Sequence, residues 1–154
     1  MGNIYDGDDV VDSRDVEERI EELEQERDDL VDIRDEASEA LEDAEPEDHA
    51  QAEADLEEAV EALTEWDNSA EGSELNDLKA FRDEVNSSEW TYGLTLIHAT
   101  YWVEYVEEML IDIGDLPQDI PHYIVIDWDQ TADNIQVDYS EADINGNTYY
   151  FRNC

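Results

Sequence analysis

The sequence contains very few basic residues. Its seven lysines and arginines include a single lysine, Lys79, and stand against 47 acidic residues, which gives a formal net charge of −40. A chain with this charge is repelled by phosphate groups, so nucleic acid and anionic membranes are both excluded as direct ligands. We therefore expect the binding partners of this protein to be basic.

Residues that support catalysis or metal binding are also scarce. The single cysteine, Cys154, excludes a disulfide framework and a thiolate zinc site. His49, His98 and His122 each stand alone, without a second histidine or cysteine at ligand spacing. No glycine-rich phosphate loop or nucleophile motif is present. We expect no enzymatic activity, no metal and no cofactor.

Long apolar runs are missing as well. The longest stretch of purely apolar character is about as short as Tyr123–Ile126, and the chain does not open with a cationic segment followed by an apolar one. We expect a soluble, intracellular protein without a membrane partner.

What the sequence does contain is a heptad pattern. Arg27 and Arg34 fill the two places where its apolar residues skip, and we expect them to pair with acids of a facing helix, such as Glu53 or Asp55. Asp12, Ser13 or Asp15 could cap the helix, and Pro46 ends it. The apolar positions are Val16, Ile20, Leu23, Leu30, Ala37, Leu41 and Ala44, and a second run has Ala52, Leu56, Ala59, Leu63 and Trp66. The short connection predicts an antiparallel coiled-coil hairpin over residues 13–67.

The remaining residues predict a compact α+β domain over 73–154. Ser73 is a candidate cap for a short helix carrying Leu75, Leu78, Phe81 and Val85. The pattern then predicts a helix over Leu94–Ile111, a buried strand over Tyr123–Ile126 and a helix capped by Asp127. Asn145-Gly146 predicts a type I′ hairpin between 139–144 and 147–152. The fold class is thus α+β and mostly helical, preceded by a flexible acidic segment over 1–12.

Acidic residues line the outward face of the first predicted helix in columns. With Ile20 at position a and Leu23 at position d, every b and c residue is acidic, and the f column is interrupted only by Gln25. On the second helix, Glu57, Glu58, Glu61 and Glu65 continue this surface. The candidate partner-binding residues on the first helix are Glu18, Glu21, Glu22, Asp28, Asp29, Asp32, Asp35, Glu36, Glu39, Glu42 and Asp43.

The density of this charge is close to that of DNA. From Asp12 to Glu45, 17 acids and four arginines give a net −13, and Asp48 to Trp66 carries seven acids and no base. At about 1.5 Å per residue, each helix bears about one charge per 4 Å, and the pair about one per 2 Å. Duplex DNA carries about one per 1.7 Å. The acids could therefore stand in for phosphate groups.

Two other interpretations of the charge stay open. The acids could only solvate a coiled-coil interaction or scaffold module of a halophile, or they could belong to an acidic chaperone of a basic DNA-binding protein. Adaptation to salt should spread the acids evenly along the chain, and they are not spread evenly. Residues 1–90 carry 35 acids and six bases, a net −29, whereas residues 91–154 carry 12 acids and one base, a net −11.

Residues 90–152 resemble the C-terminal portion of ArdA-type antirestriction proteins and of related phage proteins. The resemblance rests on Ile126-Asp127-Trp128, Asp138-Tyr139-Ser140-Glu141 and Tyr149-Tyr150-Phe151-Arg152. It implies a mimic of duplex DNA, encoded by a phage or mobile element, that binds in the DNA groove of a restriction-modification or other defence complex in the host cytoplasm. The hairpin stands where that family has tandem N-terminal domains, and homodimer formation stays open.

Overall fold

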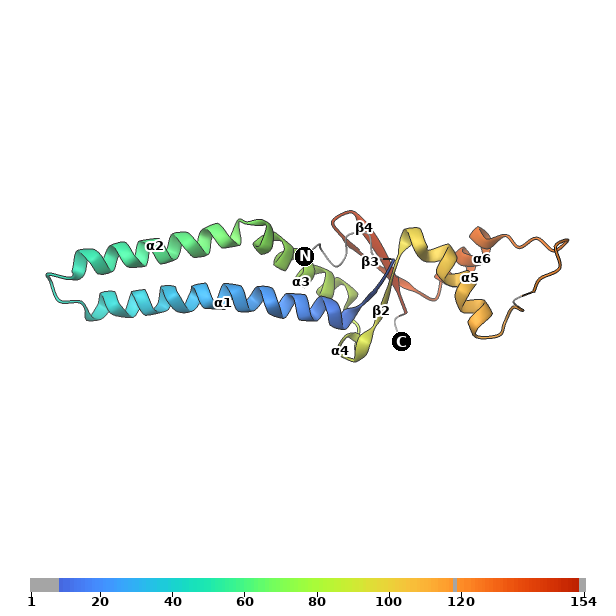
Figure 1. Cartoon of the computed structure of the whole chain (residues 1–154), viewed down its shortest axis with the longest axis horizontal. Helices are drawn as coiled ribbons and strands as arrows, with labels where there is room; N and C mark the ends of the chain where they lie inside the picture. Colours follow the sequence, from blue (N-terminus) through green and yellow to red (C-terminus); the bar gives the residue numbers. More distant parts are fainter. Residues whose placement is uncertain (1–8, 118, 153–154) are drawn as a thin grey trace. The chain divides into compact units, whose positions relative to one another are not determined.

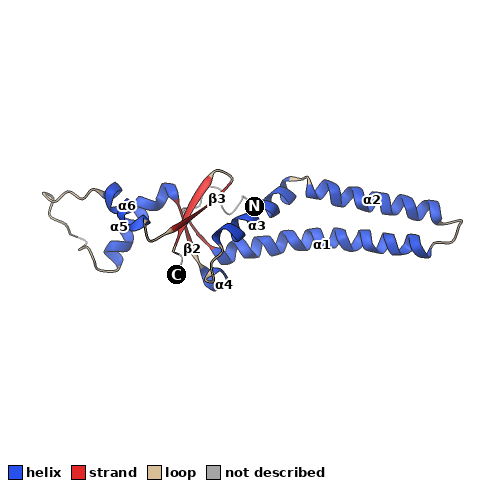
Figure 2. Cartoon of the chain, turned by 180° about the vertical axis from the view of Figure 1, so that it is seen from behind, coloured by secondary structure: helices blue, strands red, loops and turns tan. Residues whose placement is uncertain are grey.

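The computed structural model describes residues 9–117 and 119–152 and shows a mostly helical α+β protein with a small antiparallel sheet (Figure 1, Figure 2). The helices are α1 (Ser13–Asp43), α2 (His49–Asp67), α3 (Ala70–Val85), α4 (Trp90–Gly93), α5 (Trp102–Asp112) and α6 (Trp128–Gln136), with a 3-10 helix, η1 (Ala99–Tyr101). The strands are β1 (Val10–Asp12), β2 (Thr95–His98), β3 (Ser140–Ile144) and β4 (Asn147–Phe151). The predicted fold class is confirmed.

The chain divides into two units. Glu18–Lys79 form the hairpin unit, and the other described residues form the sheet unit. The boundaries fall inside α1 and inside α3, so each of these helices contributes residues to both units.

In the hairpin unit, α1 and α2 lie side by side and run in opposite directions (Figure 1, Figure 2). The heptad pattern favours this pairing, and the connection of residues 44–48 contains Pro46, which cannot continue a helix. The fully buried residues of α1 in this unit are Ile20 and Leu23, and beyond Leu23 every residue of α1 is at least partly exposed. The seam of the hairpin is therefore half-closed beyond Leu23, since Ala52, Ala59 and Leu63 of α2 are buried in it but the α1 residues are partly exposed.

The sheet unit is built on a four-stranded sheet in the order β1-β2-β4-β3, with every neighbouring pair antiparallel. Ser13 joins the start of α1 to α4 and to the residue before β2. The buried Ser13 hydroxyl donates to the Trp90 carbonyl oxygen at 2.6 Å and accepts from the Leu94 N–H at 2.7 Å. Trp102, with Val106 and Ala132, forms an apolar cluster beside the sheet. The Trp102 indole N–H donates to the Ala132 carbonyl oxygen at 3.1 Å, so this buried donor has a hydrogen-bond partner within the cluster.

The prediction of a helix over Leu94–Ile111 is wrong in its first half. Thr95–His98 form β2, which pairs with β1 on one side and β4 on the other, so Ile97 lies opposite both Val10 and Tyr150. Helix α5 begins only at Trp102. Leu94, Ile97 and Tyr101 have helical spacing, but this spacing carries no information about distant strands. The segment forms a strand because β1 and β4 pair with it.

The predicted strand over Tyr123–Ile126 is also absent. This segment forms no strand, and Tyr123 and Val125 are 76% and 91% exposed. A short apolar run predicts a buried strand only when a partner strand is available beside it. The prediction of a helix capped by Asp127 is confirmed. The Asp127 carboxylate accepts from the Gln130 N–H at 3.0 Å and caps α6.

The predicted hairpin at Asn145-Gly146 is confirmed. These residues have φ values of 48° and 79° and connect β3 to β4. Within the segment expected to be flexible, Val10–Asp12 instead form β1, because β2 offers them a pairing edge; residues 1–8 lie outside the described residues. No helix among residues 9–117 and 119–152 has the length and apolar character needed to cross a membrane.

Candidate partner-binding surface

Every predicted partner-binding residue is exposed and belongs to the hairpin unit. We call this set of residues the acidic surface. Eleven of them lie on α1 between Glu18 and Asp43, and four lie on α2 at Glu57, Glu58, Glu61 and Glu65. The heptad arrangement of α1 places them outward, because its a and d positions face α2. The structure therefore brings the carboxylates of two neighbouring helices onto one unit.

The basic side chains of the hairpin unit, residues 18–79, are all held in ion pairs. Arg19 pairs with Glu74 at 2.8 Å and with Glu22 at 3.2 Å, and Lys79 pairs with Glu24 at 3.2 Å. The Arg19–Glu74 contact is bidentate, and the Glu74 side chain is almost fully buried. Hydrogen bonding to Glu74 raises the pKa of Arg19, which stays fully charged. These cations leave no basic patch on the acidic surface.

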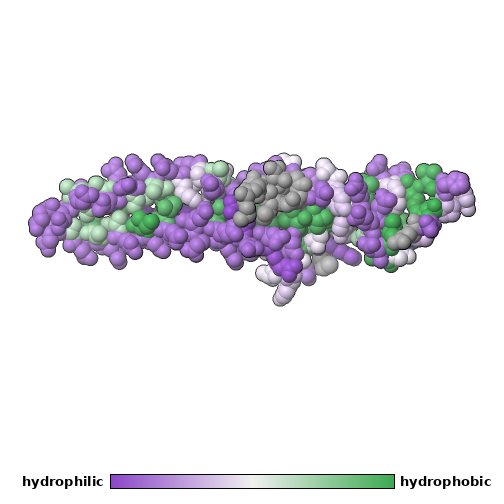
Figure 3. Space-filling model, in the orientation of Figure 1, coloured by the Kyte–Doolittle hydropathy of each residue, from purple (hydrophilic) through white to green (hydrophobic). Residues whose placement is uncertain are grey.

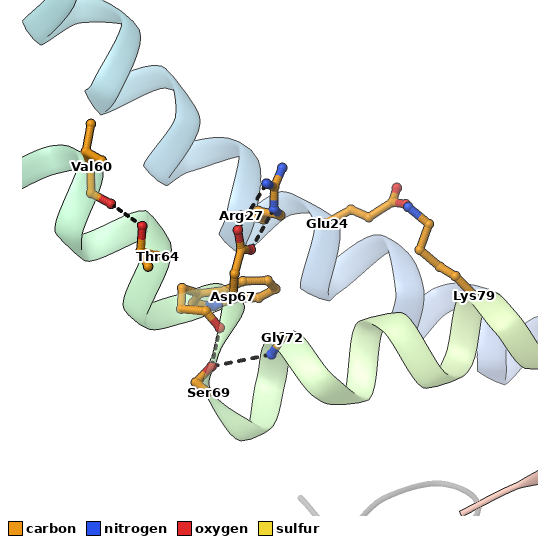
Figure 4. Close-up of polar contacts among 9 residues, drawn as sticks. Glu24, Arg27, Val60, Thr64, Asp67, Ser69, Gly72 and Lys79 are labelled. Carbon is orange, nitrogen blue, oxygen red and sulfur yellow. Dashed lines mark hydrogen bonds and ion pairs between the residues drawn. The ribbon is translucent and has the colours of Figure 1, made fainter.

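The two arginines of the seam do not contact Glu53 or Asp55, so the predicted partners are wrong. Arg27 reaches Asp67 at the end of α2, with Nε–Oδ1 and Nη2–Oδ2 distances of 2.8 and 3.2 Å (Figure 4). Arg34 instead pairs at 3.0 Å with Asp35, its neighbour on α1. Many acids compete for each arginine on this protein, so the choice depends on which carboxylate the helix pairing places within reach.

The Arg27–Asp67 pair joins α1 to the end of α2. Hydrogen bonding to Arg27 holds the pKa of the Asp67 carboxyl below its usual value of 3.8, and the same bond raises the pKa of Arg27. A carboxyl whose pKa is lowered in the folded state stabilises the fold above its unfolded pKa and loses this effect as the pH falls through the folded value. The two side chains are 40% and 42% exposed, so solvent screens the pair.

We expect Asp67→Asn to lower the free energy of unfolding at pH 7 by less than about 1 kcal/mol. The difference from the wild type should shrink as the pH falls below about 4, because the carboxyl is protonated first in the unfolded state and only at lower pH in the folded state. Urea denaturation at pH 7 and at about pH 3 measures both quantities. Asp32→Asn, which removes an exposed acid of α1, is the control and should not destabilise the protein. A loss for Asp67→Asn that is equal at both pH values would show that the ion pair does not cause it.

The net charge of the two helices can be counted between the bounds that α1 and α2 have in the structure. From Glu18 to Asp43 on α1, 13 acids and three arginines give a net −10, and α2 has seven acids and no arginine or lysine. At about 1.5 Å per residue, each helix carries about one net charge per 4 Å, and together they carry about one per 2 Å. The geometry of the hairpin thus preserves the density expected from the sequence.

No family model, curated protein or solved structure matches this chain. The resemblance to ArdA-type proteins stays a prediction from the motifs of residues 90–152. In the structure, Asp127 caps α6, Asp138 and Tyr139 directly precede β3, and Tyr149-Tyr150-Phe151 belong to β4. Among residues 9–117 and 119–152, no group of three histidine, cysteine or acidic side chains is arranged to hold a metal ion.

The structure adds a feature that the sequence analysis missed. An open groove of about 610 Å³ lies in the hairpin unit, where Leu30 of α1 meets Ala62 and Trp66 of α2. The heptad pattern indicated Leu30 and Trp66 only as seam residues. The sequence did hold a signal, since Arg27 and Arg34 flank Leu30 in the seam and cannot fill it as leucines would.

Proposed function

We propose that this protein is a non-enzymatic mimic of duplex DNA. It binds in the DNA-binding groove of a basic protein or complex and so keeps DNA out. The resemblance of residues 90–152 to ArdA-type proteins favours a restriction-modification or other defence complex as the target. The observation that carries the proposal is the charge of the hairpin, because α1 and α2 together carry about one net charge per 2 Å and the acidic surface contains 15 of their 20 acids between Glu18 and Asp67.

This spacing suits a protein groove that evolved to bind phosphate groups. Duplex DNA presents about one charge per 1.7 Å of helix axis, so the lysines and arginines of such a groove would meet carboxylates at nearly the same interval. The hairpin also holds its carboxylates in place, because they project from helices and not from a disordered chain. Binding would therefore need less ordering of the acidic partner than a flexible polyanion requires.

The charge is concentrated in the hairpin unit. Residues 18–79 contain 26 acids and four bases, a net −22, whereas the rest of the chain contains 21 acids and three bases, a net −18. Because residues 18–79 make up less than half of the chain, the hairpin unit bears nearly twice the charge per residue. A protein adapted only to high salt would not need this difference, so the distribution favours a binding surface over general solvation.

The first test measures binding to a purified restriction-modification complex and displacement of a fluorescent DNA duplex from it. At about 50 mM salt the protein should displace the duplex. Its own affinity, measured directly by fluorescence anisotropy, should fall at least about tenfold between about 50 and 200 mM salt, because exposed charge pairs are screened.

Polyglutamate at equal total charge is the control for this test. It should displace the duplex less well than the folded protein, because its carboxylates have no fixed spacing. Equal displacement by the two would favour a generic polyanion effect and contradict mimicry. Failure to displace DNA from any of several defence complexes at about 50 mM salt would favour the scaffold interpretation. Binding to free basic proteins without DNA displacement would favour the chaperone interpretation.

A further inference from the structure

The groove in the hairpin unit has an apolar floor and an acidic rim. Leu30, Ala62 and Trp66 form the floor, and Ser69 lies at the end where α2 gives way to α3. The rim carries four carboxylates, from Glu26, Asp29, Glu65 and Glu71, and no basic side chain lines the groove. An apolar strip bordered by hydrophilic residues is visible on the face of the hairpin shown in Figure 3.

A second groove adjoins the first. It has a volume of about 330 Å³ and shares Leu30 and Ala62 with it, so the apolar floor continues along the hairpin. Its other apolar residues are Ile33, Ala37 and Ala59, and Ile33 is 53% exposed. Its acidic residues are Asp55 and Glu58. The two grooves together therefore extend along α2 from about Asp55 to Trp66, which is roughly 16 Å at 1.5 Å per residue.

The end of the first groove is held by side-chain hydrogen bonds at the α2–α3 junction. The Ser69 hydroxyl donates to the Trp66 carbonyl oxygen and accepts from the Gly72 N–H at 3.3 Å (Figure 4). The bidentate Arg27–Asp67 pair ties the residue after Trp66 to α1. The groove is thus built on two helices and a fixed junction, so an occupant would find its floor largely preformed.

The chemistry of the groove specifies its occupant. Apolar side chains on an occupant would cover Leu30 and Ala62, while lysine or arginine side chains would reach the rim carboxylates and the face of Trp66. A length of roughly 16 Å matches about three helical turns. A second copy of this protein would instead bring more carboxylates to the acidic rim, and like charges in contact oppose association.

We infer that this groove binds a basic amphipathic helix of about three turns, which packs on the half-closed seam as a third helix of a bundle. The inference rests on the proposed function in one respect, namely that the helix belongs to the DNA-binding partner. It adds an apolar anchor to a surface that otherwise recognises its target by charge, so part of the binding should resist salt.

The test uses a labelled 11-residue peptide of leucine and lysine in an amphipathic pattern, which is about three helical turns, and a scrambled peptide of equal composition. Fluorescence anisotropy in about 0.15 M salt measures binding to the full chain. The amphipathic peptide should bind at least tenfold more tightly than the scrambled one, because only its helix presents one apolar face. Equal binding of the two would overturn the inference.

Ala62→Glu distinguishes the groove from general electrostatics. It adds a carboxylate, which should strengthen purely electrostatic binding, but its side chain covers the apolar floor. We expect about a tenfold loss of amphipathic-peptide affinity. Ala50→Glu makes the same change at an exposed position of α2 outside the groove and should bind within about twofold of the wild type. Equal affinities of the two variants would contradict the groove.

A second pair of variants keeps the test decisive should Ala62→Glu disturb the fold, which circular dichroism would reveal. Glu26→Gln with Glu71→Gln removes two rim charges, and Glu57→Gln with Glu61→Gln removes two exposed charges outside the groove. The rim pair should lose at least threefold more affinity than the other pair. Equal losses of peptide affinity in the two double variants would overturn the inference. Light scattering that shows self-association of the protein, with the peptide excluded, would overturn it as well. Peptide binding without displacement of DNA would contradict the proposed function and leave the groove intact.

Discussion

Neutralising four carboxylates of α1 is expected to weaken binding to the proposed DNA-binding target about 30-fold. The variant combines Glu21→Gln, Asp28→Asn, Glu36→Gln and Glu42→Gln. These residues are exposed, and none of them takes part in the ion pairs of the hairpin unit. Four exposed charge pairs at about 0.5 kcal/mol each sum to about 2 kcal/mol, which corresponds to about 30-fold in affinity.

The matched control removes four exposed acids from the sheet unit through Asp112→Asn, Asp115→Asn, Asp119→Asn and Asp133→Asn. Its net charge changes by the same amount, but we expect less than about a threefold loss of affinity. Circular dichroism should show both variants folded, since all eight positions are exposed. Equal losses in the two variants would mean that net charge, and not the hairpin, determines binding. Unchanged binding by the α1 variant would instead direct attention to the sheet unit.

Gly72→Ala is expected to lower the free energy of unfolding by about 3 kcal/mol, the largest effect on stability that we predict. Gly72 is buried in the first turn of α3. A Cβ atom at this position would lie 2.5 Å from the carbonyl oxygens of both Trp66 and Asp67. These are backbone atoms at the end of α2, so neither can move away as a flexible side chain could. The junction itself would have to open.

Ser73→Ala is the control for this prediction, because it changes the next residue of the same helix. The sequence predicted Ser73 as a cap, whose loss would cost about 1 kcal/mol. The structure instead places Ser73 exposed and inside α3, so the substitution should be nearly neutral. Urea denaturation of both variants measures the two values. A stable Gly72→Ala protein would contradict the close approach of α3 to α2. It would also weaken the case for a fixed groove.

Local signals in the sequence were sufficient for part of the fold. The 4,3 spacing of apolar residues and Pro46 predicted the α1–α2 hairpin, because both depend on neighbours within a few turns. Asn145-Gly146 predicted the β3–β4 hairpin for a similar reason, since both residues must adopt positive φ. The acidic columns also followed from heptad geometry alone, and every residue of the acidic surface is exposed in the structure.

The sequence alone could not establish which distant segments pair. Val10–Asp12 and Thr95–His98 are short, and they became strands only because each provides the other with hydrogen-bonding partners. Tyr123–Ile126 has a more apolar sequence than either, yet it forms no strand and most of it is exposed. The stability of a short strand comes mainly from its neighbours, which local sequence does not specify.

The same limit applies to the candidate binding site. The composition of the acidic surface was set by the sequence, whereas the partner of Arg27 and the grooves beside Leu30 were decided by tertiary structure. Arg27 has acids at many positions around it, and only the placement of α2 puts Asp67 within reach. A groove depends on the space that side chains from two helices leave unfilled. That space is a property of their packing, and the identity of the residues alone does not determine it.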